Sequence, residues 1–195
     1  MPIILASISP RRRELLNSLD WDFIVVPSEI IEKTIQGEKP EEMVLRLAKE
    51  KAKDVYKRNL NNWVIGADTV VTIDENIFGK PKDIVEAKKM LNTLQGRTHV
   101  VITAVALYSP DGRKLVAAEK TLVTFRKMTL NEIDAYIDQS EYADKAGAYA
   151  IQNKGVLLVE KINGCYFNVV GLPLQLLSTM FAKLGWSLSE QWRAK

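Results

Sequence analysis

The sequence has little of what disulfides, zinc centres and membrane spans require. Among its 195 residues there is one cysteine, Cys165, and one histidine, His99. These two cannot form an intramolecular disulfide or a cysteine–histidine zinc site. The longest apolar stretches, such as residues 100–108, are far shorter than the roughly 20 residues that cross a bilayer. No basic residue precedes the first apolar stretch, so we predict no secretory signal, a cytoplasmic location and no membrane partner.

An excess of charge of one sign is also absent. The 27 lysines and arginines are nearly balanced by 24 aspartates and glutamates, for a net charge of +3. This balance argues against nucleic acid as a partner, so any bound anion must be held by a local cluster of cations. A hydrophobic content of 47% excludes disorder. Because there is no repeat and no Pro/Gly/Ser-rich linker, we predict one domain over residues 1–195.

Strand and helix patterns alternate along the chain, which predicts an α/β fold with a mixed sheet flanked by helices. A turn expected at residues 109–112 joins two of the strands. We also expect the tryptophans near the C-terminus, Trp186 and Trp192, to pack on the core. The predicted strands cover residues 3–6, 23–26, 63–73, 100–108, 115–125 and 155–162. One predicted helix starts at Pro10. Four others cover residues 43–58, 83–94, 130–137 and 172–184.

Three consecutive arginines, residues 11–13, fall in the first turn of a predicted helix. Cations there oppose the positive end of the helix dipole, at a cost of about 0.3–1 kcal/mol each. A bound phosphate would reverse this effect, because free N–H groups, the dipole and guanidinium groups all attract anions. On this interpretation, Arg12→Ala weakens phosphate binding and slightly stabilises the unliganded protein. The alternative is a solvated basic face, relieved by Glu14.

Asp68 interrupts an otherwise apolar strand. A buried carboxylate loses its hydration and needs a cation or hydrogen-bond donors. Strand alternation places Asp68 on one face with Gly66 and Val70, and Thr69 on the other. We interpret Gly66 as space for a ligand to approach the carboxylate. The alternative is a structural aspartate that caps a neighbouring loop.

Lys80 and Lys145 lie beside glycine or proline, where the geometry of a loop is fixed. Each of them alone is equally consistent with an ordinary surface lysine. His99, at the start of a predicted strand, is interpreted as structural. Together with the arginines and the isolated aspartate, the two lysines indicate phosphate chemistry without naming a substrate.

Six ordered segments add a family resemblance: residues 5–12 (LASISPRR), 46–52 (RLAKEKA), 66–69 (GADT), 79–81 (GKP), 144–149 (DKAGAY) and 170–173 (VGLP). They resemble the motifs of the Maf family of nucleoside triphosphate pyrophosphatases, and the resemblance extends over nearly the whole chain. It implies an α/β fold related to the inosine triphosphate pyrophosphatases, with an elongated mixed sheet and two lobes around a deep cleft. It also implies hydrolysis of a nucleoside triphosphate to monophosphate and pyrophosphate in the cytoplasm, with a divalent metal cation, Mg²⁺ or Mn²⁺.

The resemblance also implies a role for individual residues. Asp68 matches the family's proton acceptor, which orients or deprotonates the attacking water beside the metal. Glu32 matches an acid that binds the metal together with Asp68, although Ile31 stands where the family usually has aspartate. The residues that match the phosphate-binding positions are Ser7, Arg12, Lys51 and Lys80. Neither Glu32 nor Lys51 has a local sequence signal of its own.

Arg11, Thr69 and Gln152 match the three positions that divide the family by base. The dTTP/UTP pyrophosphatase branch, which this chain resembles, has Arg, Thr and Gln there, whereas the 7-methyl-GTP branch has Trp, Gln and Glu. A glutamine amide both donates and accepts, so it can pair with O4 and N3–H of uracil or thymine. A glutamate only accepts, which suits the N1–H and amino groups of guanine. The alternative is that Arg11 and Thr69 only extend the phosphate site.

Two rival functions stay open. One is a broad-specificity house-cleaning pyrophosphatase for modified nucleotides, which a comparison of several nucleotides would distinguish. The other is a nucleotide-binding regulator of cell division without catalysis, which the presence of Asp68, Lys51 and Lys80 disfavours. Homodimers are common in such families, while nothing in this sequence shows one.

Overall fold

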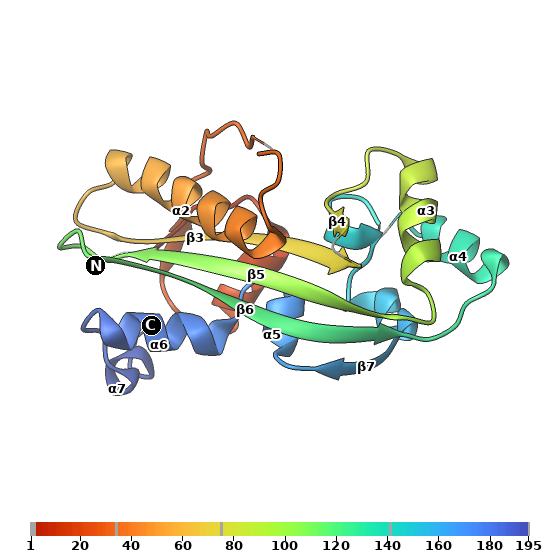
Figure 1. The fold of residues 1–195 in the computed structure, drawn as a ribbon. Helices are drawn as coiled ribbons and strands as arrows, with labels where there is room; N and C mark the ends of the chain where they lie inside the picture. Colours follow the sequence, from red (N-terminus) through yellow and green to blue (C-terminus); the bar gives the residue numbers. More distant parts are fainter. Residues whose placement is uncertain (1–2, 34, 75, 141, 195) are drawn as a thin grey trace. The chain divides into compact units, whose positions relative to one another are not determined.

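The structure is a computed structural model that describes residues 3–33, 35–74, 76–140 and 142–194 (Figure 1). The strands are β1 (Ile3–Leu5), β2 (Phe23–Val25), β3 (Trp63–Ile73), β4 (Asn76–Phe78), β5 (Thr98–Tyr108), β6 (Lys114–Phe125) and β7 (Val159–Asn163). The α-helices are α1 (Pro10–Asn17), α2 (Pro40–Arg58), α3 (Ile84–Leu94), α4 (Leu130–Ile137), α5 (Tyr166–Val170), α6 (Leu174–Lys183) and α7 (Leu188–Gln191). Two short 3₁₀ helices are η1 (Ala146–Ala148) and η2 (Asn153–Leu158).

The described strands form one seven-stranded sheet, in which the order is β2-β1-β3-β5-β6-β7 and β4 pairs with β3. Strand β1 is parallel to both β2 and β3, so that Ile4 lies opposite Ile24 and Val64. The β3–β4 and β6–β7 pairs are antiparallel. The predicted turn between β5 and β6 is closed by Ser109 N, which donates to Arg113 O at 2.9 Å. The predicted fold class, a mixed sheet with helices, is confirmed.

The chain folds into two compact units. Unit 1 comprises Met1–Asp68, Thr103–Glu119 and Gly171–Lys195, and unit 2 comprises Thr69–Ile102 and Lys120–Val170. The boundaries fall within β3, β5 and β6, so each of these strands has residues in both units. The single domain and the deep cleft stay predictions.

In unit 1, helix α2 is the longest helix and follows the predicted pattern closely. It starts at Pro40, has Glu41 and Glu42 in its first turn, and ends with Lys57 and Arg58. This order of charges is the one that the helix dipole favours. The helix is amphipathic, so its polar face lies toward solvent and a continuous apolar stripe on the other face is buried. The buried residues of this stripe are Val44, Leu47, Ala48, Ala52 and Val55.

An aromatic cluster closes the core of unit 1. The ring centroids of Trp21 and Trp186 are 4.8 Å apart, those of Trp63 and Phe181 are 4.9 Å apart, and those of Phe181 and Trp186 are 4.7 Å apart. Such edge-to-face and tilted contacts add to the stabilisation from burial alone. The prediction that Trp186 packs on the core is therefore confirmed.

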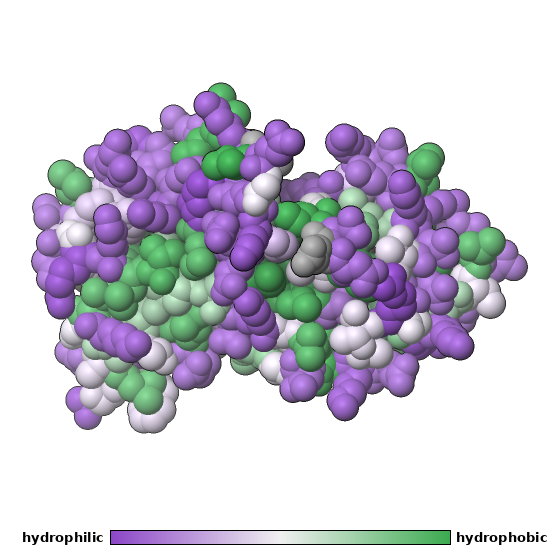
Figure 2. All heavy atoms as spheres, in the orientation of Figure 1, coloured by the Kyte–Doolittle hydropathy of each residue, from purple (hydrophilic) through white to green (hydrophobic). Residues whose placement is uncertain are grey.

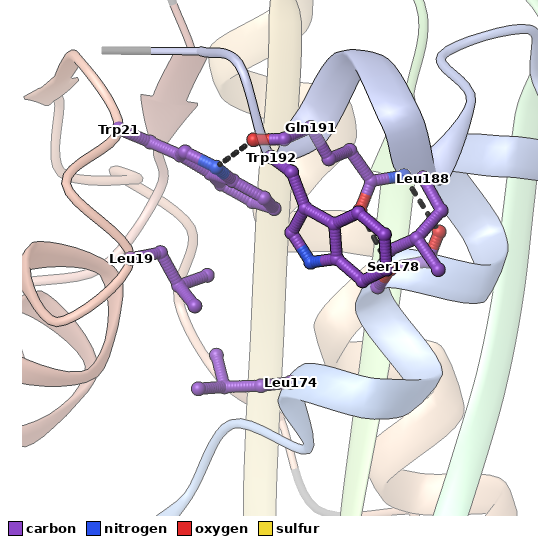
Figure 3. A pocket seen from close by; sticks show the side chains of 7 residues that line it. All are labelled: Leu19, Trp21, Leu174, Ser178, Leu188, Gln191 and Trp192. Carbon is purple, nitrogen blue, oxygen red and sulfur yellow. Dashed lines mark hydrogen bonds between the residues drawn. The ribbon is translucent and has the colours of Figure 1, made fainter.

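The same prediction is wrong for Trp192, which is 78% exposed. In α7 the neighbouring residue Gln191 is the one that is buried. Its side chain accepts from Ser178 Oγ and donates to Ser178 O, and its carbonyl accepts from Trp21 Nε1 at 3.0 Å (Figure 3). Because successive helical residues point in different directions, burying Gln191 turns Trp192 outward. Trp192 then borders a small pocket of about 170 Å³, and the residues that line it include none of the predicted site residues.

In unit 2, helices α3 and α4 pack beside the sheet and begin at well-formed caps. Asp83 accepts a hydrogen bond from Glu86 N at 2.8 Å, and Thr129 and Glu132 form a reciprocal capping box. These caps fix where each helix begins. The buried apolar residues behind them include Val71, Leu91, Leu94, Phe125, Ile133 and Ile137.

Three predicted elements need correction, and the first is β5, which starts two residues earlier than expected, at Thr98. The strand expected at residues 155–162 is wrong in its first half, because residues 153–158 form η2 and only β7 is extended. Asn153 has a left-handed φ of +53°, and a Cβ on Gly155 would lie 2.0 Å from Ala150 O, so the chain turns here. The last long helix starts two residues later than expected, because Pro173 is its N-cap.

On the face drawn in Figure 2, hydrophilic residues cover most of the surface and hydrophobic residues gather in smaller areas. Within the part of the chain that the structure describes, no helix is both long enough and apolar enough to cross a membrane.

Candidate functional site

Arg12 connects three segments of unit 1. Its Nε donates to Gly171 O at 2.8 Å, and its Nη1 donates to Ala67 O at 3.0 Å and to Ser7 Oγ at 3.2 Å. Burial lowers the pKa of Arg12, and the negative charge of Asp68 opposes this shift. The structure therefore brings Ser7 and Arg12 together at the start of α1. Their role in phosphate binding stays a prediction.

We expect Arg12→Ala to lower the free energy of unfolding by about 2–3 kcal/mol, because three hydrogen bonds from a charged, half-buried donor are lost. This result reverses the sign expected from the helix dipole alone. The measurement is urea-induced unfolding of the unliganded protein. Arg13→Ala is the matched control, because Arg13 lies in the same turn and is exposed. Equal changes in the two variants would show that the contacts of Arg12 contribute little stability.

Gly66 allows α2 to pack closely on β3, so our interpretation of it as space for a ligand is wrong. A Cβ at this position would lie 2.5 Å from Ala48 O and 2.7 Å from Ala52 N. These are backbone atoms of α2, which cannot move aside as the end of a flexible side chain can. The close approach also brings Lys51, on α2, to Asp68, which lies on the same face of β3 as Gly66.

Lys51 contacts two carboxylates at once. Its Nζ lies 2.6 Å from Asp68 Oδ1 and 2.7 Å from Glu32 Oε1. The side chains of Lys51 and Asp68 are only 12% and 13% exposed, whereas that of Glu32 is 54% exposed. Burial raises the pKa of Asp68, while the positive charges of Lys51 and Arg12 oppose the increase. Four residues to which the resemblance gives a role therefore lie together in unit 1: Arg12, Glu32, Lys51 and Asp68.

The loop that contains Glu32 is fastened to α2. Arg46 donates to both carboxylate oxygens of Glu38, at 2.7 and 2.6 Å, and Arg58 donates to Glu29 Oε1 at 2.8 Å. The hydrogen bond between Arg46 and Glu38 lowers the pKa of the glutamate. Sequence analysis missed these tethers, because nothing local shows which carboxylate each arginine meets. They hold the loop where Glu32 can reach Lys51.

Of the remaining predicted residues, Arg11 belongs to unit 1, and Thr69, Lys80 and Gln152 belong to unit 2. Thr69 and Gln152 are half-buried and Lys80 is exposed. Gly79, next to Lys80, accepts a hydrogen bond on its carbonyl from Gly147 N at 3.1 Å. The loop of Lys80 therefore contacts the segment that leads to Gln152. The roles of these residues stay predictions.

The chemistry of the two carboxylates can be compared with what a divalent cation requires. Among the described residues, no group of three or more histidine, cysteine, aspartate and glutamate side chains is placed to hold a metal ion. Mg²⁺, however, is commonly bound by one or two carboxylates together with substrate phosphates and water. Glu32 and Asp68 fit that pattern, because their oxygens already share one cation, the Lys51 ammonium.

The charges of the cluster nearly cancel. The positive charges of Arg12 and Lys51 are matched by the negative charges of Asp68 and Glu32. Arg11 adds one more positive charge close enough to lower the pKa of Arg12.

A buried acid, cations beside it and an α/β fold are the features expected of an enzyme that acts on phosphates. The chain belongs to the Maf family, whose model, described as Maf-like protein, matches residues 2–184. That range includes every residue of the candidate site.

Curated relatives are similar over nearly their whole length. The dTTP/UTP pyrophosphatase of Bacillus pumilus is 49% identical over 172 residues, which cover 88% of this chain and 90% of that protein. The dTTP/UTP pyrophosphatase of Acetivibrio thermocellus is 47% identical over 194 residues, which cover 95% of this chain and 96% of that protein. Among solved structures, the Ham1 protein of Staphylococcus aureus aligns with a TM-score of 0.45 and 21% identity, over 64% of this chain and 72% of that chain.

Proposed function

We propose that the protein is a nucleoside triphosphate pyrophosphatase that hydrolyses dTTP and UTP, and modified pyrimidine nucleotides with the same hydrogen-bonding groups. The observation that supports this most is the buried contact of Asp68 with Lys51, which also holds Glu32. The similarity to curated dTTP/UTP pyrophosphatases over most of the chain supports the choice of substrate.

In the proposed reaction, water attacks the substrate and the anhydride bond between the α- and β-phosphates breaks. The products are the monophosphate and pyrophosphate, and Asp68 accepts the proton of the water. Lys51 contacts Oδ1 of Asp68, so we assign the proton to Oδ2. Burial raises the pKa of Asp68, which makes it a better general base than an exposed aspartate.

The cations have a separate task in this proposal. An ammonium has three N–H donors, and the two carboxylates use two of those of Lys51, so the third can donate to a phosphate oxygen. Arg12 is held by hydrogen bonds to the backbone, so its charge is already in position before the substrate binds. Ser7, which shares a hydrogen bond with Arg12, and Lys80 are the other proposed phosphate partners.

We also propose a divalent cation, Mg²⁺ or Mn²⁺, held by Glu32 and Asp68. When bound, it would polarise the phosphate oxygens and offset the negative charge that develops on them.

For recognition of the base we propose Arg11, Thr69 and Gln152, with the Gln152 amide paired to the pyrimidine edge. The nucleotide substrate and the single, free Cys165 support a cytoplasmic location. A homodimer stays a prediction that analytical ultracentrifugation would test.

The experiment is a measurement of pyrophosphate release from UTP, dTTP, CTP, 5-methyl-UTP and 7-methyl-GTP. We expect kcat/KM for UTP and dTTP to exceed that for 7-methyl-GTP by about 100-fold, because a polar mismatch with the base leaves buried groups unpaired. EDTA should abolish release, and Mg²⁺ or Mn²⁺ should restore it. Similar rates for all five nucleotides would favour a house-cleaning enzyme instead. Binding without any release would favour a non-catalytic regulator.

A further inference from the structure

The buried His99 and Tyr149 contact one another inside unit 2. His99, in β5, is 1% exposed, and its Nε2 lies 2.7 Å from the hydroxyl oxygen of Tyr149, which is 5% exposed. Phe125 packs edge-to-face on both rings, with centroid distances of 4.9 Å to His99 and 4.6 Å to Tyr149. The three rings therefore form one compact cluster around a single polar contact.

Both polar groups of this contact are neutral at physiological pH. Burial lowers the pKa of His99 to about 4 and raises the pKa of Tyr149. The other ring nitrogen of His99, Nδ1, is buried and has no hydrogen-bond partner among the described residues. An unsatisfied buried nitrogen is unfavourable, and an apolar residue of similar size would avoid it. Packing alone therefore does not account for a histidine at this position.

Tyr149 follows a strained piece of backbone. Gly147 and Ala148 both have left-handed φ values, of +70° and +61°, and Ala148 has a Cβ that disfavours that region. A Cβ at Gly147 would lie 3.0 Å from Val71 Cγ2, so this part of the segment is tightly packed. Strained backbone of this kind persists only where surrounding contacts hold it in place.

The holding contacts lie on either side of this strained pair. Gly147 N donates to Gly79 O at 3.1 Å, and Ala150 N donates to Tyr136 Oη at 3.2 Å. The hydrogen bond between Tyr149 and His99 ties the segment to the long strand β5, beside the ring contact of Tyr149 with Phe125 of β6. Gln152 follows only three residues after Tyr149, at the end of this anchored stretch.

We propose that His99 is a positioning residue for base recognition, which acts through Tyr149 to fix the backbone from which the Gln152 amide reaches the base. This inference rests on the proposed function, in which Gln152 pairs with the pyrimidine. An amide that can rotate presents its donor and acceptor in either order, so it matches cytosine as well as uracil. An amide in one fixed orientation matches uracil and rejects cytosine. Anchoring therefore determines discrimination more than catalysis.

The test compares His99→Phe and Tyr149→Phe with the unmodified protein. Each variant keeps an aromatic ring and removes one partner of the hydrogen bond. We expect the preference for UTP over CTP, as a ratio of kcat/KM, to fall about tenfold, which is the effect of losing one well-placed hydrogen bond. KM for UTP should rise, kcat should change less than about threefold, and His99→Gln, which restores a polar side chain, should recover part of the preference.

Asn168→Leu is the matched control. Asn168 is buried in the same unit, lies in α5, and donates to Val101 O at 3.0 Å and to Thr121 Oγ1 at 2.9 Å. We expect it to lower thermal stability without changing the preference for UTP. A similar fall in preference in Asn168→Leu would show that any weakening of unit 2 has this effect, and would overturn the inference.

Hydrogen–deuterium exchange separates this inference from the proposed function, because it needs no activity. We expect faster exchange over residues 147–152 in His99→Phe and Tyr149→Phe, and unchanged exchange there in Asn168→Leu. If the unmodified protein has no pyrophosphatase activity, the proposed function is wrong. The exchange rates of residues 147–152 would still show whether His99 and Tyr149 hold this segment in place. If UTP is hydrolysed and the preference over CTP is unchanged in both variants, the positioning role is wrong.

Discussion

Asp68→Asn is expected to lower kcat for UTP hydrolysis by about 10²–10⁴-fold, which is the usual effect of removing a general base. The substitution keeps the volume of the side chain and removes its charge and basicity. Nucleotide affinity should change much less, because Arg12 and Lys51 remain. The measurement is steady-state pyrophosphate release together with the dissociation constant of a non-hydrolysable UTP analogue.

The stability of Asp68→Asn gives an independent check. The pKa of Asp68 is raised above its unfolded value, so the charged form is unfavourable in the folded protein and weakens the fold as the pH rises through that pKa. The neutral amide avoids this cost but gives up the ion pair with Lys51, which keeps its contact with Glu32, so the melting temperature at neutral pH should change little. Asp111→Asn, at the tip of the β5–β6 hairpin, is the control and should keep full activity. Activity of Asp68→Asn within a few-fold of the parent would show that Asp68 is structural.

Long elements with clear periodicity could be predicted from the sequence almost residue by residue. Strand β3 has the predicted bounds of residues 63–73, and α4 has those of residues 130–137. Short elements such as β4, with three residues, are too brief to show a period. The strand predicted at residues 155–162 failed for a different reason, because an apolar run also suits a 3₁₀ turn that packs on the core.

The candidate site shows the same division between local and distant information. Asp68 could be singled out because a carboxylate within an apolar strand is anomalous wherever its partner lies. Its partner, Lys51, is 17 residues away in the chain. The two side chains meet because Gly66 allows α2 to pack closely on β3, and no local pattern predicts this. The expectation for the stability of Arg12→Ala changes for the same reason, because the acceptor Gly171 O is 159 residues distant in the chain. The helix-dipole argument considers only neighbouring residues, so it cannot predict a contact with a residue this far along the chain.

Gln152→Glu is expected to lower kcat/KM for UTP and dTTP by at least about tenfold, while phosphate binding survives. A glutamine amide donates to O4 of the pyrimidine, whereas a carboxylate at the same position places an acceptor against an acceptor. An unpaired buried polar group costs about 1–3 kcal/mol, and a charged one costs more. Inhibition by pyrophosphate should be nearly unchanged, because Gln152 is assigned no phosphate contact.

The control and the purine arm make this prediction specific. Gln139→Glu introduces the same charge at an exposed position of unit 2 and should leave the kinetics unchanged. Glutamate alone should not create a good 7-methyl-GTP enzyme, because Arg11 still presents a cation where a stacking Trp would attract the methylated purine. Steady-state kinetics on UTP, dTTP and 7-methyl-GTP test all three expectations. Unchanged UTP and dTTP kinetics in Gln152→Glu would remove Gln152 from the base pocket, and with it the role that His99 and Tyr149 are proposed to support.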